Sequence, residues 1–480
     1  MNKIFTKYSS MSAPVKASLW FVFCSVLQRG ISMLTTPIFT RILTQEEYGT
    51  ISVYNSWLGI ITIIVTLELA TGVFNKAMIK YKDDRDGYAS STLFLSSCVT
   101  VAFFVVYIVG YEYWNSLFEL STVFMVMMFT DIFFTEAMLF WTVRKRFEFE
   151  YKSVVAITLI SNVLASALSV VFVLVSSNYR AELKVFGIVV VHVVVYGLVY
   201  LKILKKGKKL IQPQYWKYAV TYNLPLIPHY LSQTILNQSD RIMISRITNM
   251  GDAAVYTVAY QIAVLMNILT NAIHASFAPW AYQCISEKKY KKIGEMTLTI
   301  LIVMSIMCFM FSLFAPEIIL ILGGKAYFKA VWIVPPVAMS IVFNMLYSLI
   351  GNFAFYYEKT KFVMFGTLTA AVINIILNAI FIPLFGFVAA GYTTLVCYIL
   401  YSMLHYFFML RICKAEGIQQ PFNGRAIWGV ALVSVLLSVL ASSLYNYTVI
   451  RYVVVLVTMV ALYVKRSVII RILNLKKKED

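Results

Sequence analysis

Charged and amide side chains interrupt several long apolar stretches of this sequence. Gln28 and Arg29 lie near the middle of the first stretch. An arginine at the centre of a bilayer costs at least about 2.5–3.5 kcal/mol, so it is expected to face a water-filled cavity or a partner. A guanidinium group at that depth can hold phosphate oxygens with two parallel hydrogen bonds. The pair is therefore a candidate for binding a substrate or lining an ion pathway.

Acidic residues in two other apolar stretches suit a second kind of chemistry. Glu68 lies in the second stretch, and Asp131 and Glu136 lie about one turn apart in the fourth. Intramembrane carboxylates commonly mark ion pathways, so these residues are candidate proton or sodium sites. The alternative is structural, with Arg29 forming an ion pair with Asp131 or Glu68.

The segment TYNLPLIPHYLSQTILNQSDRIMISR is unusually polar and contains two prolines. Pro225 and Pro228 remove backbone donors and disturb a helix. A broken, polar helix at membrane depth is tolerated where it lines a cavity, and the alternative is a kinked helix in the bundle interior. Asp240 and Arg241 close the predicted helix 217–238 at its outer end and are interpreted as a gate or a salt bridge. The residues predicted to form a substrate cavity are Gln28, Arg29, Asn223, His229, Gln233 and Asn237.

Membrane-spanning helices must position these residues. Hydrophobic residues make up 60% of the 480-residue chain and charged residues only 13%, against about a quarter charged in soluble domains. About 20 apolar residues cross the roughly 30 Å hydrocarbon layer. The sequence predicts an all-α polytopic membrane protein with about fourteen transmembrane helices. The predicted spans are 17–39, 49–72, 89–110, 118–142, 154–175, 183–204, 217–238, 253–275, 296–315, 331–355, 362–382, 387–409, 426–445 and 449–464.

The distribution of basic residues predicts the orientation of these helices. With the N-terminus in the cytoplasm, most of the 41 Lys and Arg residues fall in cytoplasmic loops, as the positive-inside rule requires. We therefore expect both termini in the cytoplasm. The first helix is expected to be retained, since no small-residue cleavage site follows it. These loops also account for the net charge of +19, so no nucleic-acid partner is expected.

The two halves of the chain resemble each other. Aligning Gln28 with Gln233 places RILTQEEYGTISV over RITNMGDAAVYTV. Both segments leave one predicted helix and enter the next, and an even number of helices in each half gives parallel repeats. We predict an N-terminal lobe of helices 1–6 (residues 1–210) and a C-terminal lobe of helices 7–12 (residues 211–410). Two additional helices and a basic cytoplasmic tail follow (residues 411–480).

Motifs for catalysis or metal binding are absent from the sequence. It contains no GxxxxGK[ST], no HExxH and no Gly-x-Ser-x-Gly, which mark phosphate-binding loops, zinc proteases and serine hydrolases. The four histidines lie on four different predicted helices, and the six cysteines show no metal or redox spacing. The chain is therefore not expected to be an enzyme or to hold a metal or cofactor, although H+ or Na+ could serve as a coupling ion.

Four segments carry a resemblance to a known family. They are LTTPIFTRILTQEEYGTISVYNSW, VRKRFEFEYKS, NLPLIPHYLSQTILNQSDRIMI and NIILNAIFIPLFGFVAAGYTTLVCY, the last with Asn374, Asn378, Pro383 and Gly386. Over about residues 15–410 the chain resembles the Wzx-type flippases, the polysaccharide-export branch of the multidrug/oligosaccharidyl-lipid/polysaccharide flippase superfamily. The last two predicted helices match this family poorly.

The resemblance implies a function. A Wzx-type flippase moves an undecaprenyl-diphosphate-linked oligosaccharide across the bacterial cytoplasmic membrane by alternating access. The implied fold has two pseudo-symmetric six-helix lobes, like that of multidrug extrusion (MATE) transporters, around a cationic cavity. Arg29 would then hold the diphosphate. The implied partners are the lipid-linked oligosaccharide, membrane lipids and other polysaccharide-assembly proteins.

Other functions stay open at this point. A cation-coupled drug antiporter of the same superfamily would use acidic groups in its cavity, with Asp131 and Glu68 as ion sites. A peptidoglycan-precursor flippase would also have fourteen helices and arginines in its cavity. A polysaccharide polymerase would be expected to carry a large outer loop, and the longest predicted outer loop covers only residues 316–330. A non-transporting membrane scaffold is the last alternative.

Overall fold

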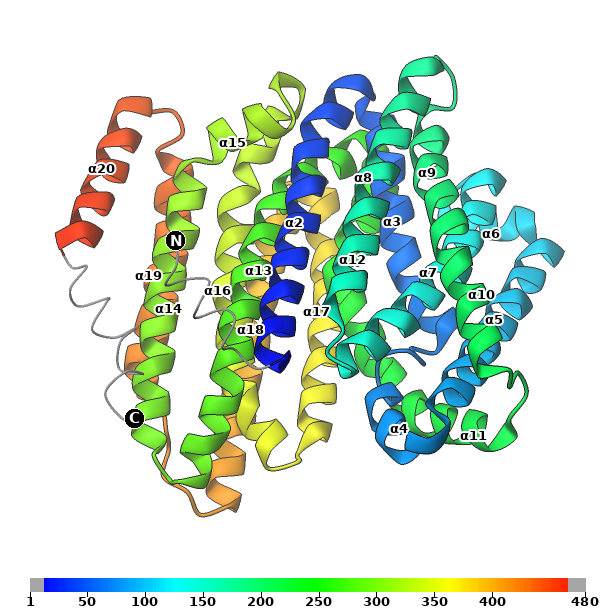
Figure 1. The fold of residues 1–480 in the computed structure, drawn as a ribbon. Coiled ribbons are helices and arrows are strands. Elements are labelled where there is room, and N and C mark those ends of the chain that lie inside the picture. Colours follow the sequence, from blue (N-terminus) through cyan, green and yellow to red (C-terminus); the bar gives the residue numbers. More distant parts are fainter. Residues whose placement is uncertain (1–12, 465–480) are drawn as a thin grey trace, which may run out of the picture. The chain divides into compact units, whose positions relative to one another are not determined.

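A computed structural model describes residues 13–464, and nearly all of them lie in helices (Figure 1). No β-strand occurs in this part of the chain. Twelve of the described helices are long and apolar enough to cross a membrane, which confirms the predicted all-α polytopic membrane fold. The chain forms two compact units, Met1–Thr257 and Val258–Asp480. The predicted cytoplasmic tail after residue 464 lies outside the described residues.

The first unit contains most of the candidate site residues. Its elements are α2 (Ala13–Ile42), α3 (Gln45–Thr66), α4 (Phe74–Lys80), η1 (Lys82–Asp84), α5 (Arg85–Val109), α6 (Tyr111–Phe118), α7 (Thr122–Phe147), α8 (Tyr151–Val175), α9 (Arg180–Val191), η2 (His192–Tyr196), α10 (Gly197–Gly207), α11 (Pro213–Asn223), η3 (Leu224–Leu226), α12 (Ile227–Ile247) and the first turns of α13 (Met250–Ser286).

The second unit begins within α13 and ends with the last two predicted helices. Its further elements are α14 (Tyr290–Leu313), α15 (Ala315–Leu322), η4 (Lys325–Trp332), α16 (Val334–Tyr356), α17 (Thr360–Phe385), α18 (Ala389–Ala415), α19 (Gly424–Ser443) and α20 (Thr448–Val464). Helix α16 is the most buried of the candidate spans, with 83% of its apolar window covered. It packs against α14, α17, α18 and α19, so the penultimate predicted helix belongs to this unit.

Two of the fourteen predicted spans are not among the twelve long apolar helices. The predicted span 217–238 is divided into α11, the short 3₁₀ turn η3 and α12. This interruption falls at Pro225 and beside Pro228, as the loss of two backbone donors predicts. The predicted span 449–464 corresponds to α20, which has only 17 residues.

The predicted span 49–72 is too long. Helix α3 ends at Thr66, and the chain continues through a turn to α4. Leu67 and Glu68 have φ angles of 53° and 51°, a left-handed conformation that costs a residue with a Cβ roughly 1–2 kcal/mol. Apolar composition continues through this turn, so the sequence pattern alone did not indicate it.

The residues that cap the N-termini of α3 and α13 are similar. Thr44 and Glu47 form a capping box, in which Thr44 Oγ1 accepts from the Glu47 N–H and Glu47 Oε2 accepts from the Thr44 N–H at 2.7 Å. At the start of α13, Asn249 Oδ1 accepts from the Asp252 N–H at 2.8 Å, and the Asn249 side-chain Nδ2 donates to Asp252 Oδ2 at 3.1 Å. Such caps satisfy backbone donors that a helix start leaves free. The two pairs occupy equivalent positions of the internal repeat.

The repeat is also visible in a direct contact. The Ser52 and Thr257 hydroxyls form a hydrogen bond, and the two residues are 205 positions apart. The same offset separates the ends of α2 and α12 and the starts of α3 and α13. Two halves of the chain therefore place their helix boundaries alike, as parallel repeats require.

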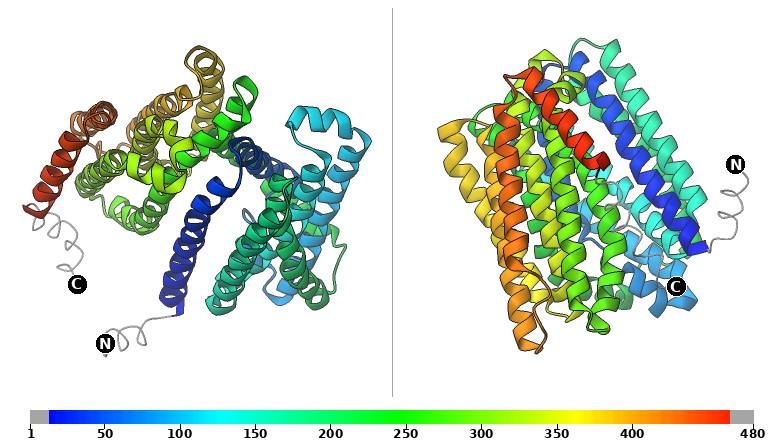
Figure 2. Two further views of the ribbon diagram at one scale, coloured as in Figure 1. Left: turned by 90° about the horizontal axis from the view of Figure 1, so that it is seen from above. Right: turned by 90° about the vertical axis from the view of Figure 1, so that its left-hand side faces the viewer.

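Within the first unit, α2 and α12 have different environments. Helix α2 packs along α8, as the two views of Figure 2 show, and only 11% of its apolar window is buried. Helix α12 packs along α3 instead, where Ser56 Oγ donates to Gln238 Oε1 at 3.4 Å. Because α11 and α12 pack on α5 and α3, the compact first unit extends beyond residue 210. The boundary at residue 210 between the two predicted six-helix lobes stays a prediction.

Candidate functional site

Asp131 and His192 form a buried pair inside the first unit. The Nδ1 atom of His192 lies 2.5 Å from Asp131 Oδ1, and the side chains are only 18% and 10% exposed. A carboxylate is an acceptor, so the imidazole Nδ1–H donates. The Thr135 hydroxyl donates to the same carboxylate oxygen at 3.2 Å. Asp131 thus has a histidine as its hydrogen-bond partner in this structure.

The helix that carries His192 is irregular at this residue. His192–Tyr196 is a π-helical turn between α9 and α10. The rings of His192 and Tyr196 stack with their centroids 4.5 Å apart and their planes at 18°. Single π turns within α-helices are uncommon and frequently lie at functional sites, since they insert one extra residue into the backbone ladder. The histidine therefore lies at a point where the helix can change its hydrogen bonding.

Glu68, Glu136 and Asn223 come together around the left-handed turn after α3. Asn223 is fully buried, and its Nδ2 donates to the backbone oxygen of Glu68 at 2.9 Å. The Thr71 hydroxyl donates to Glu68 Oε2 at 2.6 Å. Glu136 is 5% exposed, accepts a hydrogen bond from the Ala70 N–H, and interacts electrostatically with Glu68. Its Oε1 atom has no hydrogen-bond partner among the described residues.

This arrangement changes the interpretation of Asn223. Its amide nitrogen already bonds the turn at Leu67 and Glu68, and a Cβ on Gly72 would overlap its side-chain oxygen. The close fit means that Asn223 supports the turn and does not line an open surface in this structure. Two acidic groups, Glu68 and Glu136, thus interact with each other near the C-terminal end of α3.

The remaining predicted cavity residues lie on two helices of the first unit. Gln28 and Arg29 are half-buried on α2, and His229, Gln233 and Asn237 are half-buried on α12. Asn237 Nδ2 donates to the Gln233 backbone oxygen at 2.8 Å. The spacing of the three α12 residues, four positions apart, places them on one face of the helix. This face is the part of the predicted cavity wall that the structure brings together.

Asp240 and Arg241 meet around one tyrosine. The Tyr256 hydroxyl, which is fully buried, donates to Asp240 Oδ2 at 2.5 Å. The Arg241 guanidinium lies 5.5 Å from the centre of the Tyr256 ring and donates to the Asn237 backbone oxygen at 2.6 Å. Both charged side chains are buried, at 1% and 7% exposure. The structure thus gives them a packed connection between α12 and α13, and the gate stays a prediction.

Sequence reasoning missed His192 and Tyr256 as participants. His192 was considered only as one of four scattered histidines, and no spacing rule links it to Asp131, 61 positions earlier. The available signal was the histidine itself, because a polar ring within a long Val-rich stretch needs a partner. Tyr256 carries no comparable signal, since tyrosines are frequent throughout the chain.

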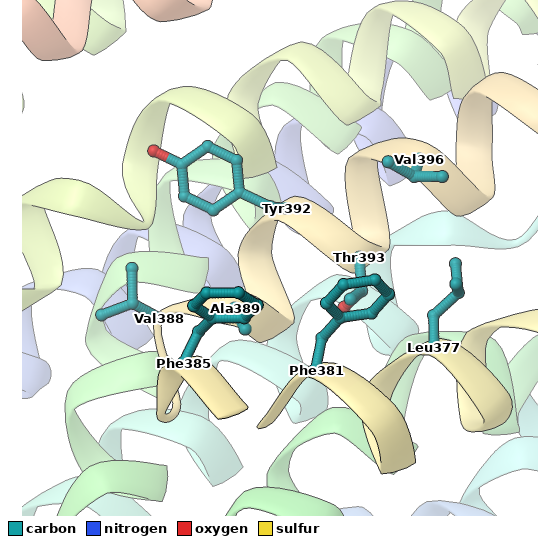
Figure 3. A pocket seen from close by; sticks show the side chains of 8 residues that line it. All are labelled: Leu377, Phe381, Phe385, Val388, Ala389, Tyr392, Thr393 and Val396. Carbon is teal, nitrogen blue, oxygen red and sulfur yellow. The ribbon is translucent and has the colours of Figure 1, made fainter. Parts of the chain in front are cut away.

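A groove on the second unit is apolar. It lies between α17 and α18, with a volume of about 470 Å³. Figure 3 shows Phe381 and Phe385 on one side and Tyr392 and Thr393 on the other. No charged residue lines it, so it offers contact to hydrocarbon rather than to a headgroup. Within the described part of the chain, no three His, Cys, Asp or Glu residues are grouped as a metal site would require.

Comparison with known proteins places this arrangement in a family. Residues 15–285 match the family described as "Polysaccharide biosynthesis protein", and residues 225–380 match the MatE family. The chain is 21% identical over 363 residues to Lsg locus putative protein 1 of Haemophilus influenzae, covering 72% of this chain and 86% of that protein. It is 22% identical over 374 residues to an uncharacterized membrane protein of the same organism, covering 75% and 88%.

Solved structures show the same fold. The lipid II flippase MurJ in an inward closed conformation superposes with a TM-score of 0.70 at 13% identity, covering 94% of this chain and 100% of that one. An inward-facing MATE family multidrug resistance transporter gives 0.64 at 14% identity, covering 81% and 96%. The family match spans more than half of the chain and confirms the resemblance indicated by the four sequence segments. The chain belongs to the polysaccharide biosynthesis protein family, and its fold is shared with solved transporters of the multidrug/oligosaccharidyl-lipid/polysaccharide (MOP) superfamily.

Proposed function

We propose that this protein moves an undecaprenyl-diphosphate-linked oligosaccharide from the cytoplasmic to the outer leaflet of the bacterial cytoplasmic membrane. The glycan would serve an O-antigen, a capsule or an exopolysaccharide. The family match over residues 15–285 supports a role in polysaccharide biosynthesis. The observation that carries the proposal is the position of Arg29, half-buried near the middle of the candidate span Leu19–Ile42.

In this proposal, residues of α2 and of α12 bind different parts of the substrate. Arg29 binds the diphosphate through its paired N–H donors, with Gln28 beside it. His229, Gln233 and Asn237 on α12 offer donors and acceptors to sugar hydroxyls. Asn223 acts indirectly, because its amide holds the turn at Glu68. Alternating access then exposes this cavity first to the cytoplasm and then to the outside.

The membrane potential favours this direction of transport. An inside-negative potential favours outward movement of an anion by about 2.3 kcal/mol per charge per 100 mV. A diphosphate with about two charges gains up to roughly 4–5 kcal/mol if both charges cross the whole field. Movement of Arg29 together with the substrate would cancel part of this gain.

Substitution of Arg29 tests the proposal. Arg29→Lys keeps the charge but loses the bidentate geometry, so export of the glycan should fall. Arg29→Gln should abolish export while the amount of protein in the membrane stays normal. Export is measured as surface glycan in a strain that depends on this protein, with lipid-linked oligosaccharide on the inner leaflet as the second readout.

Arg41→Gln provides the matched control. Arg41 lies on the same helix, near its end and exposed, so the same chemical change there should leave export unchanged. Normal export by Arg29→Gln would contradict the proposed diphosphate contact. Loss of folded protein in both Arg29 variants would instead indicate a structural ion pair.

Cysteine labelling tests the proposed role of α12. In a cysteine-less background, cysteines at positions 229, 233 and 237 should react with water-soluble thiol reagents. A cysteine at position 236 serves as the control, because Leu236 is 3% exposed and should stay protected. Protection of positions 229, 233 and 237 in every condition would favour a buried kinked helix.

A peptidoglycan-precursor flippase is the second candidate function. The observation in its favour is the likeness to the lipid II flippase fold over 94% of this chain. Depletion of the protein distinguishes the two functions. Accumulation of a polysaccharide repeat unit on its lipid carrier supports our proposal, whereas accumulation of the peptidoglycan precursor supports the alternative.

A further inference from the structure

We propose that Asp131 and His192 form a proton-binding site inside the membrane, and that its protonation state controls the π-helical turn at His192–Tyr196. The inference deepens the proposed function, because it names the ion that drives transport. Its connection to transport rests on that function, whereas proton binding by the pair does not.

The immediate surroundings of the pair suit a proton better than a sodium ion. The Asp131 carboxylate is contacted by His192 Nδ1 at 2.5 Å and by the Thr135 hydroxyl at 3.2 Å. Hard cations prefer a shell of several oxygen ligands. Here an imidazole nitrogen occupies the position that an oxygen ligand would need. The Nδ1–H of this imidazole already bonds the carboxylate, so the exchangeable proton binds at Nε2 of the same ring and needs no further ligand.

Tyrosines of the neighbouring elements lie around the pair. Tyr54 of α3 and Tyr196 of the π turn both interact electrostatically with Asp131. On the side of α5 and α10, the Tyr200 hydroxyl donates to Ser97, with Cys98 nearby. Among the described residues, no lysine or arginine forms an ion pair with Asp131. The charge of the site is therefore set by its own proton.

One proton changes the site between two charge states. With a neutral imidazole the pair carries one negative charge, and with an imidazolium it carries none. Histidine is the side chain whose charge changes most readily near neutral pH. The side chains are mostly buried, so the negatively charged state of the pair is costly in a low-dielectric environment. Loss of the proton, which produces this state, therefore favours a different packing.

The π turn offers the structural element that can respond. His192 is its first residue, so the ring that binds the proton is joined directly to the irregular backbone. Tyr196, its last residue, stacks on the same ring. A change in the hydrogen bond between His192 and Asp131 therefore affects both the first residue of the turn and Tyr196, its last residue. Conversion between π and α hydrogen bonding would rotate α10 relative to α9.

Transport would use the site in a simple cycle. One proton from the outer side binds at Nε2 of His192, which becomes an imidazolium, and the pair becomes neutral. The same proton leaves to the cytoplasm when the cavity faces inward, and the pair regains its negative charge. Only N–H and O–H bonds form and break, so no other reactant is needed.

Nitrogen NMR of the four histidines tests proton binding directly. The whole protein is labelled with ¹⁵N-histidine, placed in lipid nanodiscs and titrated between about pH 5 and 8. The signal that His192→Gln removes should show protonation in this range. Asp131→Asn should lower the proton affinity of His192 by about tenfold or more, because a nearby negative charge is lost. A His192 that stays neutral, or an unchanged titration in Asp131→Asn, would overturn the proposal.

Hydrogen–deuterium exchange tests the response of the π turn. After correction for intrinsic exchange rates, amides of residues 188–200 should exchange at different rates in the two protonation states. This difference should disappear in Asp131→Asn and persist in the matched control His274→Gln, a histidine elsewhere in the membrane helices. An equal difference in Asp131→Asn would overturn the coupling. Both experiments omit the substrate, so they stay informative if the proposed function fails.

Discussion

Glu317 and Arg451 form an ion pair that joins α15 to α20 in the second unit. Arg451 is 3% exposed, whereas the Glu317 side chain is 34% exposed. The Tyr452 hydroxyl donates to the same glutamate oxygen at 2.8 Å. Two nitrogens of the Arg451 guanidinium have no hydrogen-bond partner among the described residues. The buried arginine thus depends on one carboxylate that is itself only partly buried.

Removal of the two partners should have unequal effects. Glu317→Gln leaves Arg451 as a buried, uncompensated charge, which typically costs about 3–5 kcal/mol. Arg451→Met leaves a partly exposed carboxylate, and we expect a loss of about 1–3 kcal/mol. Thermal unfolding of the purified protein in detergent measures both. Equal losses would contradict the unequal burial, and Tyr452→Phe serves as a mild control.

Gly49 should tolerate no larger residue. A Cβ at this position would overlap the backbone carbonyl oxygen of Met250, where α3 meets the start of α13. Because a backbone atom cannot move aside as a flexible side chain can, Gly49→Ala should destabilise the protein by about 1–3 kcal/mol. Gly30→Ala is the control, since nothing lies within 4 Å of its Cβ position. A lower melting temperature is expected for Gly49→Ala only.

Glu148 should contribute a pH-dependent part of the stability. It follows α7 and accepts from Arg144 Nε at 3.1 Å and from Lys145 Nζ at 3.2 Å. Burial by itself raises the pKa of Glu148, but the hydrogen bonds and charges of these two residues outweigh it and hold the pKa below its ordinary value of 4.5. A lowered pKa in the folded state stabilises the fold above the unfolded-state pKa and loses this effect as the pH falls.

Melting temperatures of Glu148→Gln test this contribution. At pH 7 the variant should melt below the unsubstituted protein. The difference should shrink as the pH falls below about 4.5, because the glutamate then becomes protonated. Glu150→Gln is the control. Its side chain is 57% exposed, and exposed ion pairs contribute little. A difference independent of pH would exclude the proposed ionic contribution.

Reporter fusions test the predicted orientation. Fusions at Lys205, near the end of α10, and at Asp480 should both behave as cytoplasmic, because the basic loops favour the cytoplasmic side. A fusion at Lys325, in the predicted outer loop, should behave as periplasmic and provides the contrast. A periplasmic signal at Lys205 or Asp480 would contradict the predicted span assignment.

Hydropathy and proline chemistry predicted the helices well. Each predicted span overlaps at least one helix, although 49–72 runs past the end of α3 and 217–238 is divided among α11, η3 and α12, and the break at Pro225 occurs where donors are lost. The left-handed turn at Leu67 and Glu68 could not be predicted, since neither residue type favours that conformation. The partner of Asp131 could not be predicted either, because it depends on how two distant helices pack. Sequence periodicity specifies which residues face inward, and not which side chains meet there.

The contact between Ser52 and Thr257 has a consequence for the history of the chain. If each half was once a separate protein, position 52 met its own copy across a two-fold dimer, as isologous contacts require. Fusion of two gene copies would have preserved this contact while allowing the sequences of the two halves to diverge. The position equivalent to Arg29 is now Thr234. A duplicated and fused chain can therefore keep one arginine in its interior, where a symmetric dimer would have been forced to carry two.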